Sequence, residues 1–221
     1  MGRKLGIFLM VAGVALVAAA LSLFAYNCVD DTRAGRTSEK VLLELKEDVE
    51  EQASQLASEE ISSEIYKSDY FPQEGTSTGG LSMEIDTISI DENGYIGYLT
   101  LPSLGLELPV MSDWTYELLQ TAPCRYAGSP WGDNLVIAAH NYSNHFGRIS
   151  NLSPGDELYF TDVNGFVFSY EVAFLETLDS TAVEEMVTSE HSLTLFTCTY
   201  DGSARVCVRC DRVGSLASIA P

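Results

Sequence analysis

Basic residues are scarce in this sequence. Twelve Lys and Arg stand against 32 Asp and Glu, which gives a formal net charge of −20 at pH 7. Proteins that bind DNA or RNA need clustered positive charge to neutralise phosphates. The composition therefore argues against a nucleic-acid partner, although net charge says little about the fold.

Cysteine is also infrequent, and its number is odd. Five cysteines leave at least one without a partner inside the chain. Cys207 and Cys210 have a Cys-x-x-Cys spacing, but three residues apart on a strand they point to opposite faces. A zinc site would also need further ligands. We expect these two to pack in the core, Cys198 to be unpaired, and Cys28 and Cys124 to have no catalytic role.

One long apolar run is present near the N-terminus. Residues 5–26 are almost wholly apolar, and about twenty such residues span a bilayer as a helix. Arg3 and Lys4 precede the run, so the positive-inside rule places the N-terminus in the cytoplasm and the rest outside. A cleaved signal peptide is the alternative, with residues 18–20 imitating a cleavage site. The length of the run favours a retained anchor over residues 1–27.

Residues 28–81 are expected to form an acidic helical stalk and a linker. Apolar residues recur in the helix-prone part at heptad-like spacing: Leu42, Leu45, Val49 and Leu56. This pattern fits a coiled-coil dimer or a solvated amphipathic helix, and the short repeat, interrupted by Gln52, favours the latter. Residues 72–80 have the Pro, Gly, Ser and Thr content of a linker.

The sequence of residues 82–221 predicts a mainly β domain. Turn residues separate short β-prone segments, which is typical of a barrel or sandwich. Strands are expected at 94–101, 106–111, 134–139, 157–161, 166–175, 194–198 and 204–209. A short helix capped by Asp113 is expected at 114–120, and an exposed loop at 141–150.

The strand that ends at Cys198 has a predicted partner. Asp201-Gly202 is a strong two-residue hairpin signal, and counting outward from it places Arg205 opposite Cys198. A cation beside a thiol favours the thiolate and can steady an oxyanion. Arg209 has the same facing as Arg205 and is the alternative cation.

A general base is also needed, and His140 is the leading candidate. It ends the apolar strand at 134–139, and a strand end is a rigid platform for a catalytic group. His145, in the following loop, is the main substitute. His191 precedes the Cys198 strand at its far end, too distant along the strand to reach the thiol easily.

These residues together resemble the sortase family of Gram-positive bacteria. Residues 194–198 fit its Thr-Leu-x-Thr-Cys motif at every defined position, Arg205 follows on the next strand, and His140 ends an earlier one. Residues 94–102 look like the opening of the family barrel. The resemblance covers about 86–213. It implies a sortase-like closed β-barrel with short helices, preceded by the transmembrane helix and a helical linker.

The resemblance also implies a membrane-anchored cysteine transpeptidase. Such an enzyme cleaves a C-terminal sorting signal such as Leu-Pro-x-Thr-Gly in a secreted protein, through a thioacyl intermediate on Cys198. It then passes the protein to an amine of a cell-wall precursor or a pilin. His140 would exchange protons, Arg205 would bind substrate or oxyanion, and Thr197 would contribute to the oxyanion pocket.

Two other functions remain open on the sequence. A membrane-tethered cysteine protease would use the same residues with water as the acceptor, and a surface module could keep the fold without catalysis. No cofactor or metal is expected. One sortase class binds calcium through acidic loop residues, and candidates exist here, but a charged loop is usually only solvated. They are Glu176, Asp179, Glu184 and Glu185.

Overall fold

Short strands make up most of the chain beyond residue 85 in the computed structural model, which describes residues 2–58 and 85–219. The expected linker at 72–80 lies outside this part of the chain. The strands are β1 (Ile88–Ile90), β2 (Asn93–Leu101), β3 (Leu106–Met111), β4 (Cys124–Ala127), β5 (Leu135–Ala138), β6 (Glu157–Asp162), β7 (Phe166–Asp179), β8 (Leu193–Cys198), β9 (Ala204–Arg212) and β10 (Ala217–Ser218).

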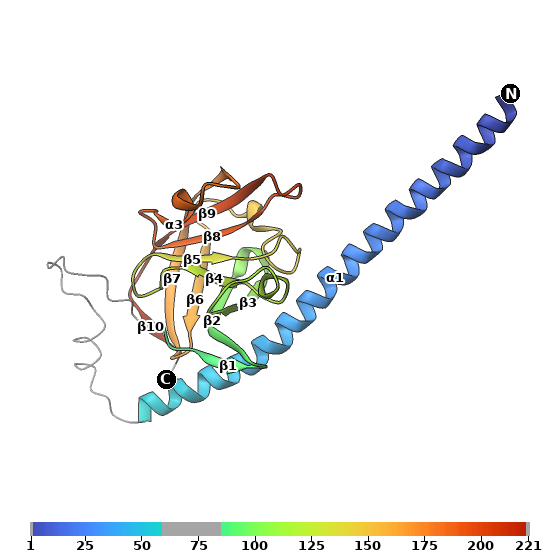
Figure 1. Ribbon diagram of the computed structural model, residues 1–221. Coiled ribbons are helices and arrows are strands. Elements are labelled where there is room, and N and C mark those ends of the chain that lie inside the picture. Colours follow the sequence, from blue (N-terminus) through green and yellow to red (C-terminus); the bar gives the residue numbers. More distant parts are fainter. Residues whose placement is uncertain (1, 59–84, 220–221) are drawn as a thin grey trace.

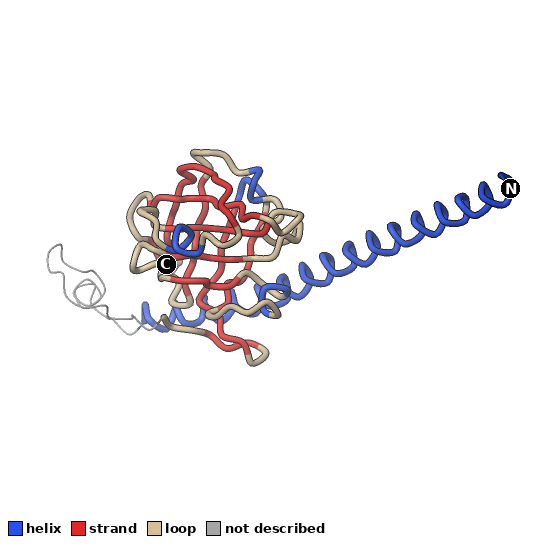
Figure 2. Tube along the Cα trace, turned by 45° about the horizontal axis from the view of Figure 1, so that its top comes forward, coloured by secondary structure: helices blue, strands red, loops and turns tan. Residues whose placement is uncertain are grey.

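The strands close into a barrel. Neighbouring strands follow the order β2-β3-β4-β5-β8-β9-β7-β6, and β6 pairs back onto β2. In the described part of the chain these eight strands form the ring, with β1 and β10 added beside it (Figure 2). Closure removes the exposed edges that an open sheet would leave. The predicted fold class, a mainly β closed barrel, is confirmed.

Side chains of alternate residues fill the barrel and cover its outside. On β8, Leu193 and Leu195 belong to the interior core, whereas Phe196 packs in an outer cluster. Gly97 lies where β2 passes close to β6. Its φ is +142°, and a Cβ there would collide with the backbone of Thr161, so the close approach requires glycine.

A single helix, α1 (Gly2–Ser58), precedes the barrel. Its N-terminal half projects away from the barrel in Figure 1, and the large apolar side chains from Ile7 to Val29 are exposed. Among the described residues this is the one helix long and apolar enough to cross a membrane. The apolar helix fits a membrane anchor.

The second half of α1 packs against the barrel. Val41, Leu45 and Val49 are buried in a cluster that includes Tyr95 and Met111 of the barrel wall. Lys46 reinforces the contact, because its Nζ lies 2.8 Å from Glu107 Oε2. The heptad-like apolar stripe therefore forms neither a coiled coil nor a solvated face. It covers the outside of β1, β2 and β3.

Two smaller segments differ from expectation. Only η2 (Leu118–Gln120), one 3-10 turn, forms within the predicted helix 114–120, and Thr115 Oγ1 accepts the Leu118 N–H in place of an Asp113 cap. The segment 141–150 is not an exposed loop, because Phe146 is fully buried. The other short elements are η1 (Pro102–Leu104), η3 (Ile149–Asn151) and α3 (Val183–Val187).

Candidate active site

Two neighbouring parallel strands bring His140 and Cys198 together. In the pairing of β5 with β8, Ala138 lies opposite Phe196, and the Ala139 N–H donates to Phe196 O at 3.2 Å. β5 ends at Ala138, and continuing its register two residues past that end sets His140 opposite Cys198. Parallel strands that end together present their next residues at the same edge of the sheet.

Thr197 joins these two strand ends. Its Oγ1 donates a hydrogen bond of 2.8 Å to Ala139 O, and the side chain is buried. The threonine directly before the cysteine and the alanine directly before the histidine are thus bonded to each other. This contact fixes the relative position of the residues that follow, Cys198 and His140.

Arg205 lies on the other side of Cys198, as predicted. β8 and β9 pair antiparallel, with Cys198 opposite Arg205. The predicted turn at Asp201-Gly202 is wrong, because the Gly202 N–H donates to Thr199 O at 2.9 Å and Gly202 takes a left-handed φ of +73°. Asp201 therefore lies at the centre of the turn, and Gly202 follows it. The register is unaffected because four residues separate Thr199 from Ala204 in either turn.

The Arg205 guanidinium folds back on this turn. Its Nη1 donates to Gly202 O at 3.2 Å and to Ala204 O at 3.0 Å. Both partners are neutral backbone oxygens; the contact with Gly202 is exposed and the contact with Ala204 is partly buried. A carboxylate or an oxyanion could replace them. In the part of the chain that the structure describes, the half-buried Arg205 makes no ion pair, although the pKa of the Asp179 carboxyl is lowered by hydrogen bonds from Thr181 and, to a smaller extent, by the Arg205 charge.

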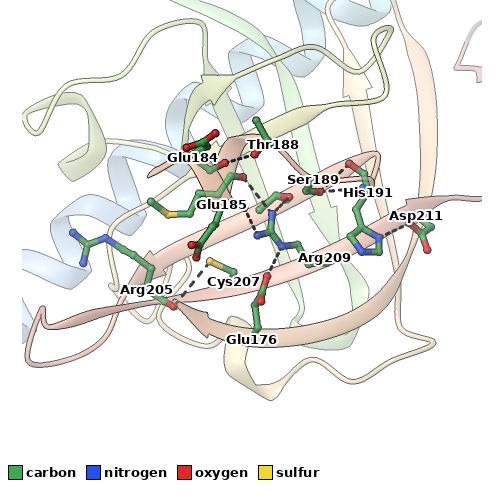
Figure 3. A network of polar contacts seen from close by, with 12 residues as sticks. Glu176, Glu184, Glu185, Thr188, Ser189, His191, Arg205, Cys207, Arg209 and Asp211 are labelled. Carbon is green, nitrogen blue, oxygen red and sulfur yellow. Dashed lines mark hydrogen bonds and ion pairs between the residues drawn. The ribbon is translucent and has the colours of Figure 1, made fainter. Parts of the chain in front are cut away.

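Arg209, the alternative cation, is committed elsewhere. It is buried, and its Nε donates to Glu176 Oε1 at 2.7 Å. Its two Nη atoms bond Thr194 Oγ1 at 2.9 Å and the backbone oxygens of Met186 and Glu185 at 3.2 and 2.7 Å. Figure 3 shows Arg209 at the centre of this network, with the Arg205 guanidinium pointing away from it. Arg209 holds α3 and the β7–β8 connection against the sheet.

Exposure separates Cys198 from the other cysteines of the barrel. Cys198 and Cys28 are exposed, whereas the other three are buried. Burial raises the pKa of the Cys124 thiol to about 12 and that of Cys207 to about 11, and it also raises the pKa of Cys210. Cys207 packs in the outer cluster and Cys210 in the interior, so they face opposite ways as predicted. Cys198 is the accessible thiol of the barrel.

Burial also separates the three histidines. His140 is half-buried, and burial lowers its pKa, against the opposing effects of Asp30, Asn141 and Asp31. His145 is fully buried, and neither ring nitrogen has a hydrogen-bond partner among the described residues. His191, at the start of β8, bonds Asp211 Oδ1 through Nδ1 at 2.6 Å. Only His140 combines partial exposure with a position beside Cys198.

Comparisons with known proteins identify the family of this chain. The family model described as the sortase domain matches residues 99–213, more than half of the chain. The chain belongs to the sortase family. Sortase A of Bacillus anthracis is 33% identical over 144 residues, which cover 61% of this chain and 67% of that protein.

Solved sortases have the same barrel. Sortase C of Streptococcus pneumoniae is similar with a TM-score of 0.55 and 23% identity, over 81% of this chain and 100% of that one. Sortase A from Corynebacterium diphtheriae is similar with a TM-score of 0.51 and 22% identity, over 56% of this chain and 63% of that one. These likenesses concern the fold.

A buried apolar cluster covers the outer face of β5, β8 and β9, next to the strand end that carries the cysteine of this sortase. Ala138, Phe196 and Cys207 form it together with Met186 of α3. Tyr126 extends it, with its ring 5.1 Å from that of Phe196, and Trp114 continues the row with its ring 5.0 Å from that of Tyr126. The sequence did not single out this row, because its members come from separate segments. The cluster itself is buried, whereas Tyr126 is half-buried and Trp114 is 39% exposed, so this end of the row offers a contact surface for apolar parts of a peptide.

The acidic residues weighed for calcium are not gathered into a site. In the described ranges 2–58 and 85–219, no group of three or more His, Cys, Asp or Glu is placed to hold a metal ion. Glu176 is paired with the buried Arg209, and Asp179 Oδ1 accepts hydrogen bonds from Thr181. These carboxylates serve the local structure.

The buried His145 makes the sortase sensitive to acid. Burial lowers its pKa from 6.5 to about 4, with His140 adding to the effect and Asp31 opposing it. The unfolded chain therefore takes up a proton first as the pH falls below 6.5, and up to about 3 kcal/mol of stability is lost between pH 6.5 and 4. In denaturant unfolding measured between pH 6.5 and 4, His145→Leu should remove this part of the loss of stability. His191→Leu should retain it; equal slopes in the two variants would contradict the assignment.

Proposed function

We propose that this sortase is a membrane-anchored cysteine transpeptidase with Cys198, His140 and Arg205 as its catalytic residues. The observation that carries the proposal is the parallel pairing of β5 with β8, whose register continued past Ala138 sets His140 opposite Cys198, with Arg205 across from Cys198 on β9. Three residue types suited to acyl transfer thus come from two adjacent strands, β8 and β9, and from the segment directly after a third, β5. Family membership supports the reaction class, and the residue roles follow from the geometry.

The reaction would proceed in two acyl transfers. Cys198 Sγ, as thiolate, attacks the scissile carbonyl carbon; the carbon–nitrogen bond breaks, and the leaving amine takes a proton from His140. The thioester then holds the acyl group on Cys198. An incoming amine attacks that carbonyl and gives its proton to His140, and the thiolate leaves. The proton balance closes because His140 ends in the state in which it began.

Arg205 and Thr197 would support these steps in different ways. The guanidinium of Arg205 would exchange its backbone carbonyl partners for the substrate or the oxyanion, and its donor fork suits both. The hydroxyl of Thr197 already donates to Ala139 O. We therefore assign the side chain of Thr197 to holding the two strand ends in register, and its contribution to the oxyanion pocket to the backbone.

The substrates would be secreted proteins with a C-terminal sorting signal of the Leu-Pro-x-Thr-Gly kind. For sortase C from Streptococcus pneumoniae, the crystal structure was used to study the specificity of that enzyme for pilin substrates. For this chain the acceptor would be an amine of a cell-wall precursor or of a pilin. Residues 1–27 would anchor the enzyme, with Arg3 and Lys4 on the cytoplasmic side and the barrel outside.

Mass spectrometry on the full chain in detergent micelles tests this proposal. A panel of sorting-signal peptides is offered with and without a glycine or diaminopimelate-type amine. We expect a peptide–amine adduct when amine is present. Without amine, we expect an acyl group that proteolytic mapping places on Cys198 and not on the equally exposed Cys28.

The other outcomes would replace the proposal. Cleavage without adduct, under every amine tried, would indicate a tethered cysteine protease that uses water. Complete absence of an acyl-enzyme on Cys198 with every peptide would indicate a non-catalytic module with the sortase fold.

A further inference from the structure

The membrane-proximal part of α1 contacts the segment that follows His140. Tyr142 Oη donates to Asp30 Oδ2 at 2.6 Å. The backbone N–H of Asn144 donates to Asp31 Oδ1, and its side-chain Nδ2 donates to Asp31 O, both at 3.4 Å. Helix and barrel are therefore joined at a second place, apart from the apolar stripe that begins at Val41.

This contact is close enough to favour a small residue on the helix. A Cβ on Gly35 would lie 2.9 to 3.0 Å from atoms of the Asn144 side chain. Glycine is unfavourable inside a helix, so its presence in α1 is consistent with a need for close approach. The hydroxyl of Ser143 adds a further hydrogen bond to the Asp31 carboxylate.

Tyr142 connects the contact to the imidazole of His140. The two rings are stacked, with centroids 4.0 Å apart and an interplanar angle of 19°. Nδ1 of His140 is buried, and no described residue hydrogen-bonds it. A hydrogen bond to that nitrogen thus does not set the plane of the ring. The stacked tyrosine, held by Asp30, restricts the ring together with a side-chain hydrogen bond to Asn141.

We propose that Tyr142 is a positioning residue for His140, and that Asp30 on the membrane anchor holds Tyr142 in place. This inference rests on the role proposed for His140. The anchor then does more than retain the enzyme at the membrane, because its juxtamembrane turn orients the group that moves the proton. The orientation of a catalytic group matters strongly, since a misplacement of about 1 Å can cost about 100-fold in rate.

The same contact sets where the active site lies. Asp30 follows Tyr26, the last residue of the apolar run, by four residues, which is about 6 Å along a helix axis. His140 is therefore held close to the membrane surface. An acceptor or substrate still attached to the membrane would meet the catalytic residues there.

The test uses the full chain in lipid nanodiscs and three variants. Tyr142→Ala removes ring and hydroxyl, Tyr142→Phe keeps the stacked ring, and Asp30→Asn removes the carboxylate charge. Tyr159→Phe is the matched control, because Tyr159 Oη donates to Glu157 Oε2 at the same 2.6 Å on β6, away from β5 and β8. Steady-state transfer kinetics and NMR titration of the His140 ring are the readouts.

The variants of Tyr142 and Asp30 are expected to shift the pKa of His140 in opposite directions. Tyr142→Ala should lower kcat by about 10- to 100-fold with KM within about twofold, and Tyr142→Phe should recover most of the loss. Tyr142→Ala should raise the pKa of His140, because burial lowers it. Asp30→Asn should lower that pKa further, because Asp30 opposes the effect of burial. Tyr159→Phe should change neither readout.

Variants of Tyr142 and Asp30 that match Tyr159→Phe in both readouts would overturn the inference. Failure of the proposed function is recognised separately. If the unmodified chain makes no product, the NMR titration alone still decides whether Tyr142 and Asp30 act on His140. Opposite pKa shifts would then support the positioning contact, and an unchanged titration would reject it.

Discussion

Replacement of Cys198 by alanine is expected to reduce peptide–amine transfer to a residual rate that only long incubations at high enzyme concentration resolve. When a nucleophile is removed from a catalytic unit, the loss is on the order of 10⁶-fold. Cys28→Ala is the matched control, because Cys28 is also exposed and unpaired but lies on α1 at the edge of the apolar run. It should keep the full rate. A Cys198→Ala enzyme with a rate well above that residual would remove Cys198 from the mechanism.

A double variant tests whether His140 acts in the same unit. His140→Ala alone should lower the rate by about 10²- to 10⁴-fold, the usual contribution of a general acid–base. Added to Cys198→Ala it should cause no further loss, because residues that act together do not contribute additively. His191→Ala should leave the rate unchanged, since Asp211 holds His191 at the far end of β8. Independent losses from Cys198 and His140 would mean that the two side chains do not share a reaction.

The elements of this site are predictable from sequence because their signals are local. The number of residues between Cys198 and Arg205 determines which residues face each other, whatever hydrogen bond closes the turn. The apolar run before His140 marks a buried strand, and β5 is found there. Sequence alone could not show that β5 and β8 are parallel neighbours. The catalytic roles of these residues remain predictions.

The roles of the long helix were not predictable in the same way. A stripe of apolar residues shows that one face of a helix will be covered, but not what will cover it. Leu45 and Val49 fit a coiled coil, a membrane surface or a barrel wall equally well, and the barrel is what covers them. The hydrogen bond between Asp30 and Tyr142 joins residues 112 positions apart, and neither lies in a motif.

Two local predictions, the Asp113 helix cap and the exposed loop at 141–150, were wrong. Asp113 precedes Trp114 as a helix cap would, yet Ser112 Oγ donates to the Asp113 carboxylate and Thr115 caps the turn instead. The segment 141–150 has the polar character of a surface loop. Its Phe146 and Ile149 nevertheless complete the barrel core, because two apolar residues are enough to anchor a loop inward.

Leu45→Ala is expected to lower the free energy of unfolding of the barrel by about 2 to 5 kcal/mol, the usual cost of truncating a buried leucine. Leu45 is 0% exposed, whereas Leu43, two residues earlier on α1, is 67% exposed. Leu43→Ala therefore makes the same chemical change on the same helix and should cost less than about 0.5 kcal/mol. Tryptophan fluorescence during denaturant unfolding measures both, because Trp114 and Trp131, the two tryptophans of the chain, lie in the barrel.

The comparison separates a helix that belongs to the folded domain from one that only tethers it. If α1 were a free stalk, the two leucine variants would unfold alike, and the barrel would have to expose Tyr95 and Met111. Tyr95 gives an independent measure, since burial, with a smaller effect of Asp91, raises its pKa to about 12. Loosening α1 by Leu45→Ala should move the phenol titration back toward 10. The same helix carries Asp30, so a weakened contact at Leu45 should also weaken the hold on His140. Stability and transfer rate should therefore fall together in Leu45→Ala. Both should stay nearly unchanged in Leu43→Ala.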